Sequence, residues 1–147
     1  MTDEELIALA RAAALKAYAP YSGFHVGCAV VSTRGEVVSG ANLENACYRL
    51  GICAEQSALA AAQHAFGLDQ IARIVVAGGT PGAHGLAGQQ PVTPCGGCRQ
   101  ALLEAAQLSG HDIEILSASG DGRAMRRDTI RGLLPHGFGP EDLKDAD

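Results

Sequence analysis

The sequence has no hydrophobic stretch that approaches the roughly 20 residues of a membrane-spanning helix. It also has no apolar segment behind a basic flank near its start, where Asp3, Glu4 and Glu5 stand instead. The first absence argues against a membrane partner, and the second argues against a secretory signal peptide. With 47% hydrophobic and 18% charged residues, the composition is typical of a compact soluble protein. We therefore expect a cytoplasmic protein.

Basic residues are also fewer than acidic ones, 11 Lys and Arg against 16 Asp and Glu, so the formal net charge is −5. Proteins that bind nucleic acids usually carry a basic stripe that neutralises phosphates. The dense basic cluster of this chain shares its segment with acidic residues: Arg123, Arg126, Arg127 and Arg131 lie among Asp121 and Asp128. A solvated surface explains that cluster best. We expect no nucleic-acid partner, and long polyanions are poor candidates for a substrate.

A chain of 147 residues is long enough for one domain with a sizeable core and too short for two ordinary ones. Periodicity and capping signals predict these elements: a helix from the Thr2–Glu5 capping box to about Tyr18, a hairpin of strands 24–33 and 36–40, a helix over 53–66, a strand over 71–77, a helix after Thr93 to about 107, and strands over 112–119 and 123–126. This alternation favours one α/β domain, 1–147, with a mixed sheet between helices.

Three segments lack such periodicity. Residues 42–52 form a polar, irregular stretch, which is a typical place for functional residues. The glycine-rich residues 78–90 are predicted to form a mobile surface loop. The polar tail over about 141–147 is expected to fray.

Two short motifs carry the chemistry, Cys53-Ala54-Glu55 and Pro94-Cys95-Gly96-Gly97-Cys98. Each stands at the predicted start of a helix, where free backbone N–H groups favour a thiolate. Three sulfur ligands would leave the fourth position of a tetrahedral zinc open for water, as in catalytic sites. Glu55 is then placed to take and pass on the proton of that water.

Two other interpretations fit the cysteines alone. Five cysteines cannot all pair within one chain, so metal ligands or core residues are favoured over disulfides. However, Cys95 and Cys98 could form a redox dithiol, or Cys28 or Cys47 could complete a structural zinc site. Neither alternative requires a carboxylate at Glu55, and this residue favours a catalytic zinc.

Cys-Ala-Glu followed by Pro-Cys-x-x-Cys resembles the zinc nucleoside and nucleobase deaminases. Four further segments are similar to the cytidine deaminases and occur in the same order: 19–27, 40–46, 98–100 and 133–138, the last followed by 141–143. The similarity covers most of the chain. It implies a three-layer α/β/α sandwich with a five-stranded mixed sheet.

The resemblance also implies the chemistry of the site. Cys53, Cys95 and Cys98 would hold one zinc ion per subunit, and Glu55 would shuttle protons while water attacks C4 of cytosine. The reaction would convert cytidine and deoxycytidine to uridine and deoxyuridine plus ammonia, in pyrimidine salvage. A deaminase for blasticidin S is a rival, but it would have no need of the sugar contacts that Asn42 and Glu44 are expected to make.

The substrate contacts implied by the resemblance come from several segments. Asn42 and Glu44 would bind the 3′-hydroxyl of the ribose and Phe24 would pack on the base, although Phe24 could equally be a core aromatic. The set of contacts also includes Leu43, the amide of Ala54 and the carbonyl of Thr93. Small members of the family are homotetramers, and the candidates for contacts across subunits are Ala46, Tyr48 and Phe138.

Two departures from the family stand out. Many relatives with three cysteines carry arginine directly after the glutamate, where it offsets the negative charge of a zinc with three thiolates. Here the residue is Gln56, and we expect it to share this compensation with the helix N-termini and Arg99. Residues 78–90 are also longer than in compact members, and a tolerated insertion explains them best.

Overall fold

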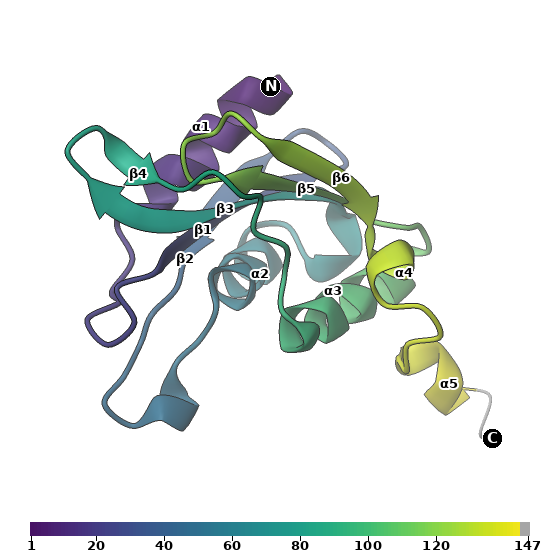
Figure 1. The fold of residues 1–147 in the computed structure, drawn as a ribbon. Coiled ribbons are helices and arrows are strands. Elements are labelled where there is room, and N and C mark those ends of the chain that lie inside the picture. The colour runs from purple at the N-terminus through teal and green to yellow at the C-terminus, as the bar shows by residue number, and fades with distance from the viewer. Residues whose placement is uncertain (145–147) are drawn as a thin grey trace.

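A mixed β-sheet forms the middle layer of the protein in the computed structural model, which describes residues 1–144 (Figure 1). Its strands are β1 (His25–Ser32), β2 (Val37–Ala41), β3 (Ile71–Gly82), β4 (Gly85–Ala87), β5 (Glu114–Ser119) and β6 (Met125–Thr129). The order is β2-β1-β3-β5-β6, with β4 paired to β3. Among these six described strands, β3 and β5 pair in parallel and the other pairs are antiparallel.

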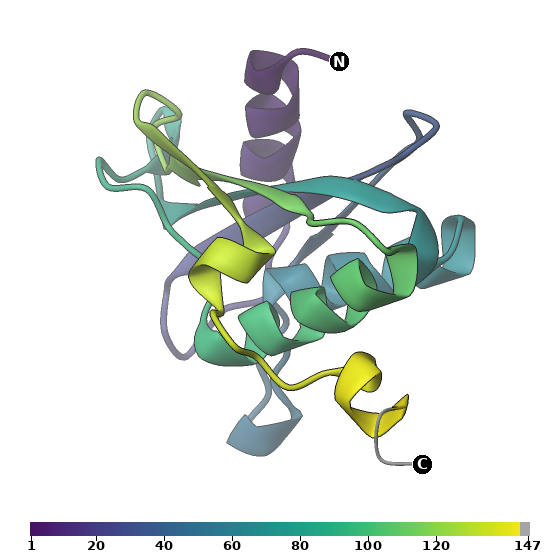
Figure 2. The same cartoon turned by 90° about the vertical axis from the view of Figure 1, so that its right-hand side faces the viewer.

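Alternation along the central strands divides the core between the two faces of the sheet, because successive strand side chains point to opposite sides. In β3, Ile74 and Val76 belong to the cluster under α2 (Ala54–Ala65) and α3 (Gly96–Ser109). Val75 and Ala77 belong to the cluster under α1 (Asp3–Ala14). Figure 2 shows α1 on one side of the sheet and the other two helices opposite. The predicted three-layer α/β/α architecture is confirmed.

Helix α1 begins at the predicted capping box of Thr2 and Glu5 but ends at Ala14, four residues before the expected Tyr18. The chain leaves the helix early because Tyr18 bridges to Leu43, with its N–H donating to the carbonyl of Asn42 over 3.1 Å. This contact fixes the segment around Asn42 against the end of the first helix.

Helices α2 and α3 carry the cysteine motifs at their starts. Cys53 is the N-cap of α2, as expected. Helix α3 starts later than predicted, because its N-cap is Cys95 and not Thr93, and the carbonyl of Cys95 accepts the first helical bond from the N–H of Arg99 at 2.9 Å. Gly40 of β2 lets α2 lie close to the sheet, since a Cβ there would be 2.5 Å from the backbone nitrogen of Ala58.

The prediction of a mobile loop over 78–90 was wrong for most of that segment. Strand β3 continues to Gly82 and returns as β4, so the sheet has six strands and not five. The pairing depends on close backbone approach, because a Cβ on Gly79 would stand 1.9 Å from the carbonyl oxygen of Ala87. Glycine and alanine give no hydrophobic alternation by which these strands could be predicted.

The C-terminal part also differs from expectation. Strand β6 lies over Met125–Thr129, slightly later than the predicted 123–126, because its pairing with β5 extends to Thr129. Two short helices follow, α4 (Ile130–Leu133) and α5 (Pro140–Lys144). Helix α5 occupies part of the tail that was expected to fray, and residues 145–147 lie outside the described residues. Two 3-10 turns, Tyr48–Leu50 and Leu68–Gln70, complete the described elements.

Within residues 1–144, no helix combines the length and the apolar character that crossing a membrane requires.

Candidate metal centre and active site

The first turns of α2 and α3 bring three cysteines together. The sulfur atoms of Cys53, Cys95 and Cys98 all lie within 4.8 Å of one another, and those of Cys53 and Cys95 are 3.9 Å apart. A tetrahedral zinc with Zn–S bonds of 2.3 Å would separate two sulfurs by about 3.8 Å. The three thiols therefore fit a zinc ion.

The surroundings of these thiols also fit a metal site. Burial raises the pKa of Cys98 far above that of an ordinary thiol, and burial is also the main cause that raises the pKa of Cys53. In contrast, the backbone N–H of Cys98 is the main cause that lowers the pKa of Cys95. Buried thiols become thiolates when a cation compensates the charge, and a metal ion supplies this compensation.

The other two cysteines lie outside this cluster. Cys28 is fully buried in the core and Cys47 is exposed. Neither belongs to the group of possible metal ligands found in residues 1–144. The structure thus favours three cysteine ligands over the four of a closed structural zinc site.

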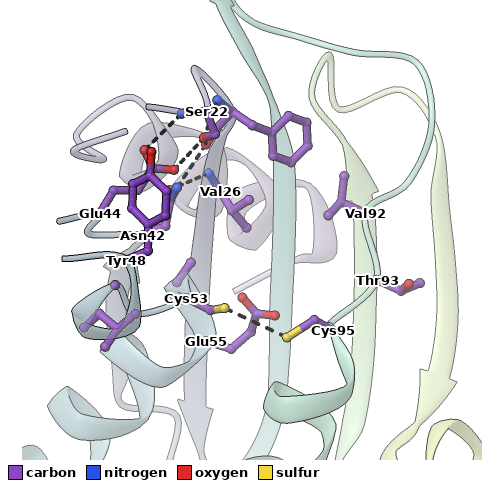
Figure 3. Close-up of a pocket in the computed structure, with 14 residues that line it drawn as sticks. Ser22, Val26, Asn42, Glu44, Tyr48, Cys53, Glu55, Val92, Thr93 and Cys95 are labelled. Atoms are coloured by element: carbon purple, nitrogen blue, oxygen red, sulfur yellow. Dashed lines mark hydrogen bonds between the residues drawn. The ribbon is translucent and has the colours of Figure 1, made fainter. Parts of the chain in front are cut away.

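Glu55 is the buried carboxyl group of the site, with 4% of its surface exposed. Figure 3 shows its side chain between those of Cys53 and Cys95. Burial is the main cause that raises its pKa, because removal from water disfavours the charged form. A carboxyl group with a raised pKa exchanges protons more readily near neutral pH, as a general acid and base must.

Gln56 and Arg99 have different partners. The side-chain amide of Gln56 donates to the sulfur of Cys98 over 3.9 Å, as expected for a group that offsets thiolate charge. The guanidinium of Arg99 donates to three oxygens: the carbonyls of Pro94 (2.8 Å) and Leu133 (3.0 Å) and the hydroxyl of Thr93 (3.4 Å). We expected Arg99 to help offset the thiolate charge, but among the described residues it donates no hydrogen bond to a sulfur atom.

A cavity of about 410 Å³ opens above the cysteines. Figure 3 shows Cys53, Glu55 and Cys95 at one end and Ser22, Asn42 and Glu44 at the other. Its lining combines predicted and unpredicted residues: Ser22, Phe24, Val26, Asn42, Glu44, Tyr48, Gly51, Ile52, Cys53, Ala54, Glu55, Val92, Thr93 and Cys95. Among residues 1–144, no arginine, lysine or histidine is part of this lining.

Asn42 and Glu44 are held in place by the backbone around Phe24. The Asn42 side chain accepts from the N–H of Val26 and donates to the carbonyl of Phe24, each over 2.9 Å. The Glu44 carboxylate accepts from the N–H groups of Tyr21 and Ser22 and from the Ser22 hydroxyl. Because a carboxylate has about four acceptor positions and an amide group several, both side chains keep capacity for a ligand.

The remaining predicted residues are divided between the cavity and other surfaces. Phe24, Ala54 and Thr93 line the cavity, and so does Tyr48, which is 78% exposed. Leu43 lines a separate hollow beside α1, and Ala46 is exposed. Phe138 is exposed beside the first half of α3, where its carbonyl accepts from the side chain of Gln100.

Sequence reasoning missed several lining residues, among them Ser22, Val26 and Val92. Val26 stands in a predicted strand and Val92 follows the glycine-rich segment, so neither carries a local signal of a binding role. Ser22 lies next to the left-handed turn at Gly23 (φ +68°), which is the local feature that could have indicated it.

Comparisons with known proteins agree with this geometry. The family described as "Cytidine and deoxycytidylate deaminase zinc-binding region" matches residues 1–109. A cytidine deaminase of Halalkalibacterium halodurans is 39% identical over 129 residues, 88% of each chain. That of Sporosarcina psychrophila is 35% identical over 146 residues, 99% of this chain and 98% of its own.

Solved structures lead to the same family. The crystal structure of cytidine deaminase from Burkholderia pseudomallei superposes with a TM-score of 0.80 at 41% identity. The alignment covers 94% of this chain and all of that one. Together with the three-cysteine site and the buried Glu55, these matches show that the chain belongs to the zinc-dependent cytidine deaminase family.

Proposed function

We propose that the protein hydrolyses cytidine and deoxycytidine to uridine and deoxyuridine, with release of ammonia. One observation carries the proposal: the buried Glu55 lies beside the three-cysteine cluster on the floor of a cavity whose far end is polar. Family membership supports the same reaction, because the relatives described above are named cytidine deaminases.

The reaction needs a nucleophilic water and a group that moves its protons. Cys53, Cys95 and Cys98 would hold the zinc, which lowers the pKa of a bound water when present. Glu55 takes a proton from the water and delivers it to N3 of the cytosine ring as oxygen adds to C4. Glu55 then carries the second proton to the amine, so that the C–N bond breaks and ammonia leaves. Its burial supports this role, because protons pass more easily through a carboxyl group with a raised pKa.

The other end of the cavity would hold the sugar. Asn42 and Glu44 keep free acceptor or donor positions, and we assign them to the 3′-hydroxyl. Phe24 would pack on the base, with Leu43, the Ala54 amide and the Thr93 carbonyl as further contacts. The lining, as far as the described part of the chain forms it, offers no cation for a 5′-phosphate, and the Glu44 carboxylate would repel such a group. This supports nucleosides over nucleotides as substrates.

We further propose a homotetramer that works in pyrimidine salvage in the cytoplasm. Tyr48 and Phe138 are 78% and 61% exposed, and a neighbouring subunit would cover such aromatic side chains. In that assembly Ala46, Tyr48 and Phe138 could contribute to the cavity of another subunit. Light scattering of the purified protein tests this assembly, because a monomeric mass would contradict it.

The function is tested by incubating zinc-loaded protein with cytidine, deoxycytidine and CMP while released ammonia is measured. We expect turnover of both nucleosides and little of CMP. Glu55→Gln is the matched control, because it keeps the shape and the three thiols but cannot carry a proton. It should lower kcat by roughly 10²–10⁴-fold while zinc content stays the same.

Two results would contradict the proposal. Zinc-loaded protein that releases no ammonia from either nucleoside would exclude the reaction. Full activity of the Glu55→Gln variant would exclude the proposed proton transfer. A stable protein without stoichiometric zinc would instead favour a redox dithiol.

A further inference from the structure

We propose that Ser22 is a positioning residue for nucleoside binding. Its single hydroxyl group holds both the Glu44 carboxylate, at the sugar end of the cavity, and the backbone of Phe24, whose ring would pack on the base. The inference rests on the proposed function, because it gives Ser22 a part in nucleoside binding.

The first contact of the Ser22 hydroxyl is its hydrogen bond to Glu44. The Ser22 hydroxyl donates to one carboxylate oxygen over 2.5 Å. The other oxygen accepts from the N–H groups of Tyr21 at 3.0 Å and Ser22 at 3.1 Å. Both oxygens of Glu44 are thus directed by residues that lie 22 and 23 positions earlier in the chain. Strand pairing does not fix the direction of this side chain, so these bonds do.

The second contact of the Ser22 hydroxyl is its hydrogen bond to the backbone of Phe24. The hydroxyl oxygen of Ser22 accepts the N–H of Phe24 over 3.0 Å, across the turn made possible by the left-handed Gly23. On the other side of the same residue, the Asn42 side chain donates to the carbonyl of Phe24 over 2.9 Å. The backbone of Phe24 is therefore held from both sides, by Ser22 and Asn42 at the sugar end of the cavity.

The electrostatics agree with this geometry. The Ser22 hydroxyl is the main cause that lowers the pKa of Glu44, and its backbone, Tyr21 and the nearby His25 lower it further. Glu44 therefore stays ionised at neutral pH and can only accept hydrogen bonds. This is the state needed to receive a hydrogen bond from a sugar hydroxyl.

The position of this cluster argues that it serves binding more than folding. Ser22 and Glu44 lie at the exposed end of the cavity, and hydrogen bonds on exposed surfaces contribute little to stability. Removal of the Ser22 hydroxyl should consequently leave the fold intact. What it should change is the direction of Glu44 and the place of Phe24.

The test compares Ser22→Ala with Ser22→Thr, on cytidine and on 3′-deoxycytidine, which lacks the hydroxyl assigned to Glu44. Ser22→Ala should raise KM for cytidine about tenfold with little change in kcat, because a contact made equally before and during the reaction affects binding alone. Ser22→Thr keeps the hydroxyl and should restore the KM. The penalty on 3′-deoxycytidine should be smaller, because Glu44 has no 3′-hydroxyl to bind there and only the shift of Phe24 then weakens binding. Ser39→Ala, at an exposed serine of β2, is the control.

A readout without turnover separates this inference from the proposed function. Titration of the Glu44 side chain by NMR should show its pKa rising toward the ordinary value in Ser22→Ala and remaining low in Ser22→Thr. An unchanged pKa, an unchanged KM, or an equal loss on both substrates would overturn the role of Ser22. If the wild type deaminates no nucleoside, the proposed function fails, while the titration still decides whether Ser22 holds Glu44.

Discussion

At the scale of residues, the charge on the metal site is its most sensitive property. Three thiolates around one zinc ion carry a formal charge of about −1, which weakens the zinc as a Lewis acid. Gln56 lies where many relatives are expected to carry arginine, and it gives the sulfur of Cys98 one neutral N–H donor over 3.9 Å. The first turns of two helices add their backbone N–H groups at Cys53 and Cys95.

Substitutions at Gln56 should show how much of this compensation it provides. Gln56→Leu removes the donor, and we expect zinc affinity to fall about tenfold, as for other groups that bond to metal ligands. Gln56→Arg keeps a donor and adds a charge, so activity should change by no more than about threefold, because the helix N-termini already compensate part of the charge.

Competition with a metal chelator and steady-state kinetics measure both effects. A large gain of activity in Gln56→Arg would show that the native site is under-compensated. Gln63→Leu is a control on the same helix, because Gln63 bonds to the N–H of Leu68 and not to a sulfur.

At the scale of elements, Arg99 joins three parts of the chain. It starts from the first turn of α3 and bonds to Thr93 and Pro94, which precede that helix, and to the last residue of α4, Leu133. Thr93 and Cys95 line the cavity on either side of Pro94. The guanidinium thus supports one wall of the site from behind and ties it to the C-terminal segment.

We expect Arg99→Lys to weaken this wall although it keeps the charge. A lysine cannot bond to all three oxygens, so part-buried carbonyls would lose their donor at a cost of about 1–3 kcal/mol in the free energy of unfolding. The value of kcat/KM should fall about tenfold because the wall loosens.

Thermal unfolding and kinetics on cytidine measure the two losses. Arg34→Lys is a fair comparison, since Arg34 is exposed in the turn between β1 and β2. If Arg99→Lys were as stable and as active as the wild type, Arg99 would not support this wall of the cavity.

The elements also show which features a sequence can predict. The cysteine motifs were placed correctly at helix starts because capping and ligand spacing are local properties. The β3–β4 hairpin was missed because Thr80 pairs with Ala87 beside Gly79, whose backbone lies close to the Ala87 carbonyl, and this glycine-rich segment leaves no alternation of side chains. The partners of Arg99 and Ser22 were missed for a related reason: Leu133 and Glu44 are distant in sequence, and only the fold brings them near.

At the scale of the whole molecule, a group of charges connects the start of α1 with three strands of the sheet, β3, β5 and β6. Asp3 at the start of α1 accepts from Arg73 of β3 at 2.6 Å and from Arg127 of β6. Glu114 of β5 also contacts both arginines. The arginines lower the pKa of Asp3, Arg73 having the largest effect.

Asp3→Asn should therefore lower the Tm by roughly 1–2 °C at pH 7, the effect of a partly exposed ion-pair group. The pKa of Asp3 is lower in the folded than in the unfolded protein, so its contribution is complete above the ordinary carboxyl pKa. It is lost as the pH falls through the folded value. The Tm difference should shrink below about pH 4.

Thermal melts of both proteins between pH 3 and pH 7 measure this difference. Glu4→Gln removes the same charge from the same helix turn but breaks no ion pair among the described residues, and it corrects for the helix dipole. A Tm difference that grew toward low pH would contradict the assignment.

The contacts of Asn42 and Glu44 have a consequence for redesign of the protein. Both side chains form hydrogen bonds with the backbone, at Tyr21, Ser22, Phe24 and Val26. A library that varies them to accept a different sugar would also release the loop that carries Phe24, so most variants would lose affinity for every nucleoside. Directed evolution toward new sugars should instead succeed first at Tyr48 and Val92, which line the cavity without side-chain hydrogen bonds in the described chain.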